Sequence, residues 1–203
     1  MTPRAYVSPA RAAAAGEKRQ RVIAAAGALL IERTNVATFS MEVVAKAAGV
    51  TRLTVYNQFG SRRGLLEAVF DERARQGGLH RIPTAMAIPD PRTGLNRLIQ
   101  IFCEFWSGDE AVGRLHDAGA LDAEFALALA ERNERRRHAI KVLVGRIGAD
   151  LDRPAPRRDD LTDLIFGLTS YPMFRILSSG RTPEATCALI TSACIAALET
   201  PSN

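Results

Sequence analysis

The sequence has little of the chemistry that enzymes and metal proteins need. Its 203 residues include only three histidines and three cysteines. His80, His116 and His138 lie in different segments, and no Ser/His, Cys/His or metal-ligand spacing occurs. Neither a G-x-G-x-x-G motif nor a P-loop is present. We therefore expect no catalytic residue, no metal and no cofactor, and we regard an enzyme as a weak alternative.

The cysteines are Cys103, Cys187 and Cys194. An odd number of cysteines without a secretory signal is typical of reduced, buried thiols. Cys187 and Cys194 are seven residues apart, so they would share one face of a helix. A redox switch at this pair is an alternative that no other feature of the sequence supports.

Long apolar runs and strand patterns are also missing. No stretch of about 18 apolar residues occurs, so no membrane span is expected. The AAAA at 12–15 is too short and too weakly apolar for a signal peptide. These absences predict a cytoplasmic protein. Hydrophobic residues make up 47% of the chain, which is enough for a substantial core, and we expect an all-α fold.

Positive charge is concentrated in the first part of the chain. Residues 1–79 contain 12 Lys/Arg and 6 Asp/Glu, a balance of +6, whereas residues 80–203 contain 15 and 16, a balance of −1. Together these give the net charge of +5. A basic N-terminal part on a nearly neutral body is typical of a protein that binds a polyanion such as DNA.

The stretch 40–66, SMEVVAKAAGVTRLTVYNQFGSRRGLL, predicts two short helices joined by a glycine turn. Ser40 is a favourable N-cap for the first helix, and Thr51 can cap the second. Gly49 stands where the first helix must end and the chain must reverse, a position that favours a residue without a Cβ. Two helices joined in this way form a helix-turn-helix, whose second helix reads DNA.

The rest of the chain also predicts helices. We expect a mobile basic arm over 1–16, a helix-turn-helix DNA-binding domain over 17–78, and a helical effector-binding and dimerisation domain over 79–203. Helices are predicted over about 17–33, 62–76, 93–107, 122–147, 159–179 and 183–199, with Pro172 kinking or interrupting the fifth. The charged run 131–137 is interpreted as a solvated face, because opposite charges alternate at helical spacing.

The residues AGVTRLTVYNQFGSRRGLLEAVF at 48–70 resemble the TetR family of one-component transcriptional regulators. In that family a helix-turn-helix is followed by Tyr-x-x-Phe, a small residue, a basic residue and a Leu-Leu pair. Tyr56, Phe59 and Leu65-Leu66 match this pattern, and the resemblance covers about 17–72. Leu53 departs from it, since a small residue often stands there, and Arg62 replaces the usual lysine.

The resemblance implies that the second helix lies in the major groove. Arg52 is the best candidate for a bidentate contact to guanine, and Leu53 and Thr54 suit a thymine methyl group. Phosphate contacts are expected from Thr51, Tyr56 and Arg62, and Asn57 could take either role. Three alternatives stay open: Arg52 contacts a phosphate, Tyr56 packs against the first helix, or Leu53 is merely exposed.

One such domain buries too little surface for tight, specific binding, so we expect a homodimer on a palindromic operator. The final helix carries an apolar stripe of Leu189, Ile190, Ala193, Ala197 and Leu198. The resemblance implies that residues 159–199 form an intermolecular four-helix bundle. The alternative is that this stripe packs only inside the monomer.

The resemblance also implies a small-molecule effector in the C-terminal domain, and the aromatic residues there suggest an apolar or aromatic one. The predicted pocket residues are Phe102, Glu104, Phe105, Trp106, His116, Phe125, Phe166 and Tyr171. Each aromatic could instead be ordinary core. The chain is therefore expected to be a ligand-responsive regulator, most simply a repressor. An activator, or a helical small-molecule-binding protein without an operator, is the alternative.

Overall fold

The computed structural model describes residues 9–32, 39–120, 122–150 and 155–200. Every regular element in these ranges is helical, which confirms the predicted all-α fold. The chain divides into two compact units. Unit 1 comprises Met1–Glu72 with Arg114–Ala126, and unit 2 comprises Arg73–Gly113 with Leu127–Asn203.

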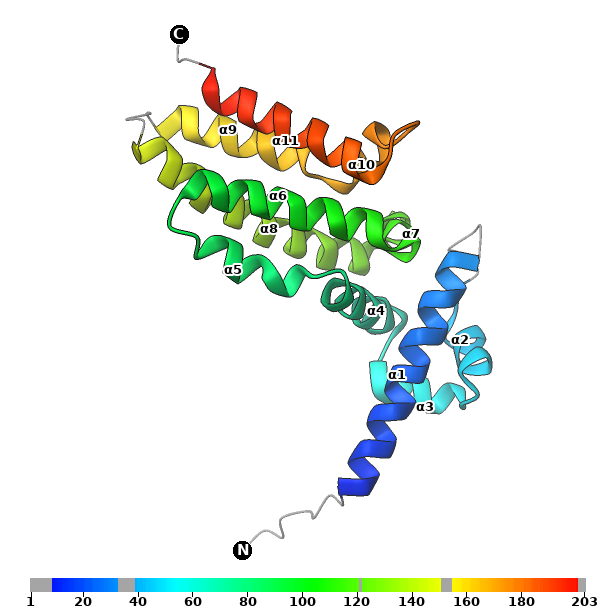
Figure 1. Cartoon of the computed structure of the whole chain (residues 1–203). Helices are drawn as coiled ribbons and strands as arrows, with labels where there is room; N and C mark the ends of the chain where they lie inside the picture. The colour runs from blue at the N-terminus through cyan, green and yellow to red at the C-terminus, as the bar shows by residue number, and fades with distance from the viewer. Residues whose placement is uncertain (1–8, 33–38, 121, 151–154, 201–203) are drawn as a thin grey trace, which may run out of the picture. The chain divides into compact units, whose positions relative to one another are not determined.

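Unit 1 contains the predicted helix-turn-helix. Its N-terminal segment contains α1 (Pro9–Glu32), α2 (Met41–Ala48), α3 (Arg52–Phe59) and the first part of α4 (Arg62–Gln76). Helix α2 packs against both α1 and α3 (Figure 1). The core under them includes Val22 and Leu30 of α1 and Phe39 ahead of α2, all at most 2% exposed.

The helix expected from residue 17 begins earlier, at Pro9. Residues 9–16, which we expected in a mobile arm, are therefore helical, and residues 1–8 of that arm lie outside the described residues. Two local features explain the difference. Proline is tolerated in the first turn of a helix, where its missing N–H has no partner to lose. The alanines that follow have the highest helix propensity of any residue.

The predicted caps of the helix-turn-helix are confirmed. The Ser40 hydroxyl accepts a hydrogen bond from the Val43 N–H at 3.3 Å, and the Thr51 hydroxyl accepts one from the Thr54 N–H at 3.1 Å. Gly49 has φ +64°, in the left-handed region that ends helices. The turn is therefore set by residues within four positions of one another.

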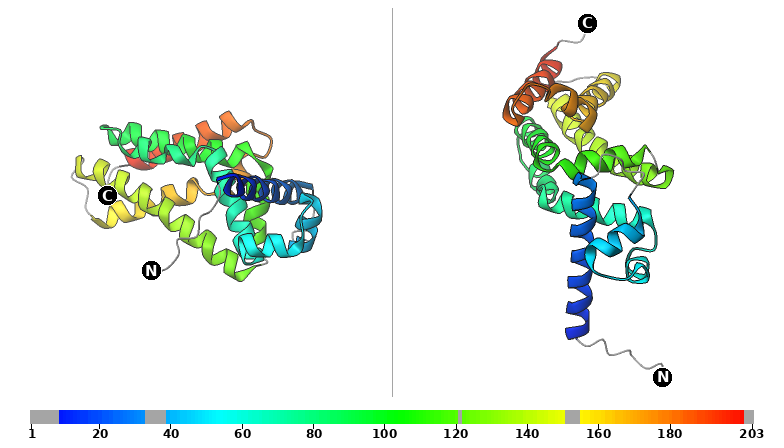
Figure 2. Two further views of the ribbon diagram at one scale, coloured as in Figure 1. Left: turned by 90° about the horizontal axis from the view of Figure 1, so that it is seen from below. Right: turned by 90° about the vertical axis from the view of Figure 1, so that its right-hand side faces the viewer.

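Unit 2 is built around α6 (Pro91–Gly108), which is buried over most of its length. Helix α11 (Pro183–Glu199) packs against both α6 and α9 (Ala155–Leu168), as Figures 1 and 2 show. The remaining elements are η2 (Leu79–Arg81), α5 (Ile82–Met86), α7 (Glu110–Gly119), α8 (Ala123–Asp150) and α10 (Tyr171–Leu177). Helices α7 and α8 begin in one unit and continue in the other.

The helices predicted over 93–107, 122–147 and 183–199 correspond closely to α6, α8 and α11, whereas η2, α5 and α7 were not predicted. Helix α9 begins at Ala155, ahead of the expected start at Asp159, and residues 151–154 lie outside the described residues. The expected break at Pro172 is confirmed, because α9 ends at Leu168 and α10 begins at Tyr171. The Ser170 hydroxyl caps α10 by accepting a hydrogen bond from the Met173 N–H at 3.4 Å.

The two units differ from the expected domains in two respects. Their division falls inside α4, between Glu72 and Arg73, rather than after residue 78. The segment Arg114–Ala126, expected in the C-terminal domain, belongs to unit 1. The predicted helices alone could not reveal this division. Tertiary packing decides which side chains share a core.

None of the described helices is long and apolar enough to cross a membrane. No group of three or more His, Cys, Asp or Glu side chains that could hold a metal ion occurs among the same residues.

Candidate functional site

Helix α3 exposes large side chains on one face. Leu53 is 66% exposed and Tyr56 is 58% exposed, and Thr51, Arg52 and Asn57 are exposed as well. Thr54 is half-buried. Tyr56 is therefore not a core residue packed against α1, which was one of the alternatives. An exposed face with a guanidinium, a phenol, an amide and apolar side chains has the chemistry needed to contact base edges and phosphates.

The opposite face of α3 packs inside unit 1. Val55 is fully buried and Phe59 is 9% exposed. The guanidinium of Arg19 on α1 lies 4.5 Å from the centre of the Phe59 ring, and its Nη1 donates to the Gln58 carbonyl at 3.3 Å. A cation over an aromatic ring and a bond to the C-terminal turn both favour this orientation. The helix is thus held with its exposed face outward.

Arg62, from which the sequence predicts a phosphate contact, has two partners within unit 1. Its Nη1 pairs with the Asp122 carboxylate at 2.8 Å, and its Nε donates to the Phe39 carbonyl at 3.1 Å. The other Asp122 oxygen accepts from the Phe125 N–H at 2.9 Å and so caps α8. Arg62 therefore ties the start of α4 to the start of α8 within unit 1. The sequence offers no signal for a partner 60 residues away.

Five of the predicted pocket residues gather in unit 2, on α6, α9 and α10: Phe102, Phe105, Trp106, Phe166 and Tyr171. The Trp106 ring centre lies 4.8 Å from that of Phe105 and 5.6 Å from that of Tyr171. The Trp106 indole N–H donates to the Thr169 carbonyl at 3.0 Å. We call these five residues the aromatic cluster. It joins α6 to the break between α9 and α10.

Arg136 packs against two rings of this cluster, a position that the sequence did not predict. We interpreted the run 131–137 as solvated, yet Arg136 is only 6% exposed. Its guanidinium lies 4.0 Å from the Phe166 ring centre and 5.7 Å from that of Phe102. Its Nη1 donates to the Phe166 carbonyl at 2.9 Å and to the Thr169 hydroxyl at 2.8 Å. Burial lowers its pKa to about 10, so Arg136 is still charged at neutral pH.

A signal for Arg136 was present in the sequence. Leu129, Ile140 and Leu143 are buried on α8, and Arg136 stands seven residues after the first, four before the second and seven before the third. It therefore lies on the apolar stripe of the helix. This spacing distinguishes Arg136 from the other charged residues of the run 131–137.

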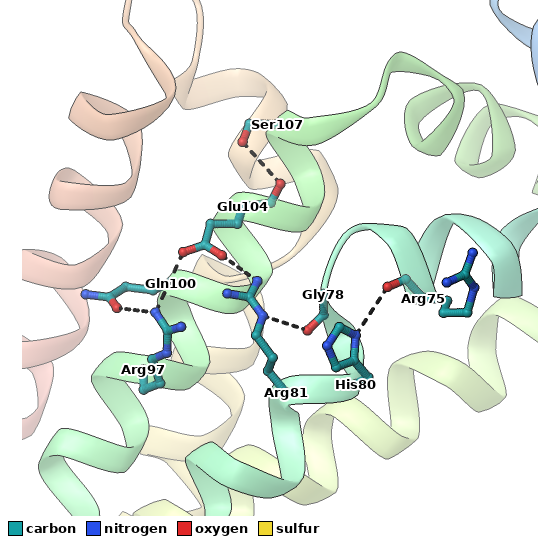
Figure 3. Close-up of polar contacts among 8 residues, drawn as sticks. All are labelled: Arg75, Gly78, His80, Arg81, Arg97, Gln100, Glu104 and Ser107. Atoms are coloured by element: carbon teal, nitrogen blue, oxygen red, sulfur yellow. Dashed lines mark hydrogen bonds and ion pairs between the residues drawn. The ribbon is translucent and has the colours of Figure 1, made fainter.

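Glu104 lies on a different face of α6, 49% exposed, and is held by arginines. Arg81 of the η2 turn pairs with its carboxylate, and the Arg97 guanidinium lies 3.7 Å away. Figure 3 shows Glu104 between these two arginines, with Arg81 also donating to the Gly78 carbonyl. The negative charge of Glu104 is therefore balanced by arginines of unit 2.

Glu104 lines two cavities of unit 2. One, of about 320 Å³, is bordered by its pair with Arg81 and by an ion pair at 2.9 Å between Arg73 and Asp109. The other, of about 510 Å³, lies between α6 and α11. Both volumes fall in the range of small-molecule sites. Of the predicted pocket residues, Glu104 and Phe105 line the first cavity, and Glu104 lines the second.

Comparison with known proteins identifies the N-terminal helices. Residues 22–69, which run from within α1 into α4, match the sequence profile of "Bacterial regulatory proteins, tetR family". The chain belongs to the TetR family. It is accordingly a transcriptional regulator. No curated protein matches it in sequence.

Solved structures share the TetR-family fold over most of the chain. NalD from Pseudomonas aeruginosa, the secondary repressor of the MexAB-OprM multidrug efflux pump, is 18% identical, with a TM-score of 0.65 over 90% of this chain and 96% of NalD. A transcriptional regulator from Rhodococcus sp. Rha1 is 19% identical, with a TM-score of 0.62 over 89% and 96% of the two chains. The multidrug binding protein EbrR, solved with imidazole, is 19% identical, with a TM-score of 0.60 over 92% and 97%. At these identities the likeness establishes the fold alone.

Two of the predicted pocket residues of this TetR-family chain do not join the others. His116 and Phe125 lie in Arg114–Ala126, which belongs to unit 1. Phe125 is fully buried there and His116 is half-buried. We predicted them in the C-terminal domain because their segment follows α6 along the chain. In the structure Phe125 is instead buried within unit 1, the unit that contains the helix-turn-helix.

The predicted dimerisation segment of the TetR-family chain splits into two faces. On α11, Ile190, Cys194 and Leu198 are at most 2% exposed and pack inside the monomer. Leu189 on α11 is 40% exposed, and Leu164 on the neighbouring α9 is 50% exposed. Only part of the predicted stripe is therefore available to a second chain.

Proposed function

We propose that this TetR-family regulator is a repressor that binds a palindromic operator as a homodimer. The observation that carries the proposal is the exposed face of α3, on which Arg52, Leu53 and Tyr56 project while Val55 and Phe59 are buried. A recognition helix anchored on one face and polar on the other is what major-groove reading requires.

The residues of α3 take different roles in this proposal. Arg52 reads a guanine, while Leu53 and Thr54 contact a thymine methyl group. Thr51 and Tyr56 hold phosphates, and Asn57 contacts either a base or a phosphate. Arg62, committed to Asp122 and the Phe39 carbonyl, positions α4 behind the recognition helix. This revises the direct phosphate contact that we expected of it.

Selection of DNA from a random pool by the purified protein tests the operator. We expect an inverted repeat whose half-sites are centred about one helical turn, roughly 34–36 Å, apart. A single half-site, or no enrichment, would contradict the palindromic operator. Binding to the selected sequence should weaken steeply as salt rises, since phosphate contacts release counterions. Salt-independent binding would favour a small-molecule-binding protein without an operator.

We propose that two chains pair through the outer face of α9 and α11. Leu164 and Leu189 supply apolar area, and Ala193 and Ala197, both half-buried, allow close approach of a partner helix. Four helices, two from each chain, would then bury these leucines. Such a pairing has two-fold symmetry, as an inverted repeat requires.

We propose that a small apolar or aromatic effector binds unit 2 and releases the operator. The two cavities and the aromatic cluster support this location. Helix α4 begins in unit 1 and ends in unit 2, so it can transmit a change of shape between them. EbrR, which shares the fold, is a multidrug binding protein, and this favours an effector of the same broad class.

Repression is preferred to activation because NalD, which shares the fold, is a repressor. A reporter gene placed behind the selected operator distinguishes the two. Expression should fall when the regulator is supplied, whereas a rise would establish an activator. Because a bacterial regulator must meet chromosomal DNA, we place the protein in the cytoplasm.

A further inference from the structure

Two cysteines from different helices line the same cavity of unit 2. Cys103 lies on α6 and Cys187 on α11, and both border the cavity of about 510 Å³ between these helices. The two helices pack directly against each other. The pKa of the Cys103 thiol is raised, first by burial and then by a hydrogen bond with Cys187. The structure thus brings together two thiols that are 84 residues apart in the sequence.

The pair suggested by the sequence, Cys187 and Cys194, cannot form a disulfide. Both lie on α11, and seven residues of α-helix rise about 10.5 Å. The Cα atoms of a disulfide are separated by less than roughly 7 Å. Cys194 is also fully buried, and burial raises its pKa to about 12. Cys103 is therefore the only described partner that reaches Cys187 through a shared cavity, since the described residues contain just these three cysteines.

The two thiols differ in their access to solvent. Cys103 is 4% exposed, whereas Cys187 is half-buried at the wall of the cavity. A raised pKa keeps a thiol protonated and slows its reaction, because the thiolate is the nucleophile. A reagent that enters the cavity should therefore react first with Cys187. The buried thiol of Cys103 would react only afterwards, with the oxidised Cys187.

We propose that Cys103 and Cys187 form an oxidation site at which a hydroperoxide produces an intrachain disulfide between α6 and α11. In the first step the Cys187 thiolate attacks the distal peroxide oxygen and the O–O bond breaks. The alcohol, or water from hydrogen peroxide, leaves with a proton, and Cys187 becomes a sulfenic acid. In the second step the Cys103 sulfur attacks that sulfur and the S–O bond breaks. Hydroxide leaves as water with the Cys103 proton, so two electrons have passed from the thiols to the peroxide.

The disulfide would change the cavity as well as the thiols. It would link α6 to α11 across the cavity that Glu104 also lines. Bridging two walls reduces the space that a small molecule can occupy. The site is independent of the proposed repressor function, since its test requires no DNA.

The test is peptide mapping of the full-length, reduced protein after treatment with one equivalent of hydrogen peroxide. Trypsin leaves Cys187 and Cys194 on one peptide, because no Lys or Arg follows Arg181. Chymotrypsin, which cleaves after Leu189, separates them. We expect a peptide containing Cys103 joined to one containing Cys187, formed within a single chain and lost on addition of dithiothreitol.

Matched variants assign the roles of the two thiols. Cys194→Ala should still form the bond, because Cys194 takes no part in it. Cys103→Ala should form none and should instead accumulate a Cys187 sulfenic acid that dimedone traps. Absence of the Cys103–Cys187 peptide from the oxidised wild-type protein would overturn the proposal. A disulfide found only between chains, or one from Cys103 to Cys194, would also overturn it. Because this measurement uses the wild-type protein, its outcome does not depend on a substitution that could impair folding.

Discussion

Arg52 and Arg136 show how much the role of an arginine depends on its surroundings. Arg52 is exposed at the start of α3, with its guanidinium free to meet a nucleic acid. Arg136 is 6% exposed among aromatic rings and bonds to a carbonyl and a hydroxyl. The first arginine can supply recognition, and the second joins α8 to the end of α9.

Replacing Arg52 by alanine should weaken binding to the selected operator by roughly 1–3 kcal/mol if Arg52 reads a base. Binding to random DNA should change less, because a base contact contributes only to the specific complex. Fluorescence anisotropy on both DNAs measures the two losses. Arg135→Ala, which removes an exposed cation on α8, is the charge-matched control. An equal loss on both DNAs would show that Arg52 contacts a phosphate.

Replacing Arg136 by alanine should destabilise the protein more than replacing it by methionine. Alanine leaves a cavity against Phe102 and Phe166, at a cost of about 2–4 kcal/mol. Methionine keeps an apolar stem there and removes the desolvation cost of the buried charge, so we expect a loss below about 1.5 kcal/mol. Urea unfolding compares the two variants. If methionine is as harmful as alanine, the hydrogen bonds to Phe166 and Thr169 outweigh the packing.

The helix-turn-helix shows at the scale of elements how a short sequence sets its own geometry. Ser40, Gly49 and Thr51 begin and end α2 and α3 through contacts that span no more than four residues. The ends of α4 and α8 are different, because Arg62 and Asp122 join them across the chain. An element's ends are therefore predictable, while its partner is a property of the fold.

Two glycine substitutions should have opposite effects on stability. Gly49→Ala introduces a Cβ that meets nothing within 4 Å, but φ is +64° there, so we expect a loss of roughly 1–2 kcal/mol. Gly16→Ala also meets nothing within 4 Å, in helix α1, and should gain roughly 0.5–1 kcal/mol. Thermal unfolding measures both. No gain from Gly16→Ala would contradict the early start of α1.

At the scale of the whole molecule, the proposed function requires a second chain and uses the two units of this chain for different tasks. Unit 1 presents α3, and unit 2 contains the cavities and the leucines of α9 and α11. One α3 makes too few contacts for high specificity, so the pairing face matters as much as the recognition helix.

Leu164→Glu or Leu189→Glu should break the homodimer, because each places a charge in the proposed apolar interface. We expect the dimer dissociation constant to rise at least roughly tenfold, with operator binding weakened in parallel. Sedimentation velocity follows the first effect. Leu127→Glu, at a 64% exposed leucine on α8, is the matched control and should remain dimeric. An unchanged dimer in both variants would place the interface on another face.

Much of this architecture could be read without the structure. The all-α fold, the helix-turn-helix, and the ends of α4 and α11 depend on capping residues, glycines, prolines and the spacing of apolar residues along one segment. The exposed residues of α3 followed from the same pattern. The predicted pocket residues are divided between the units, since His116 and Phe125 lie in unit 1 and the others in unit 2.

The sequence by itself determined the elements of this TetR-family protein, because caps and turns are contacts between near neighbours. Only the tertiary structure decided which distant side chains meet. It joined Arg62 to Asp122, buried Arg136 between Phe102 and Phe166, and placed Cys103 and Cys187 on one cavity. The physical reason is that such pairs depend on how helices pack, and packing buries whichever faces fit together.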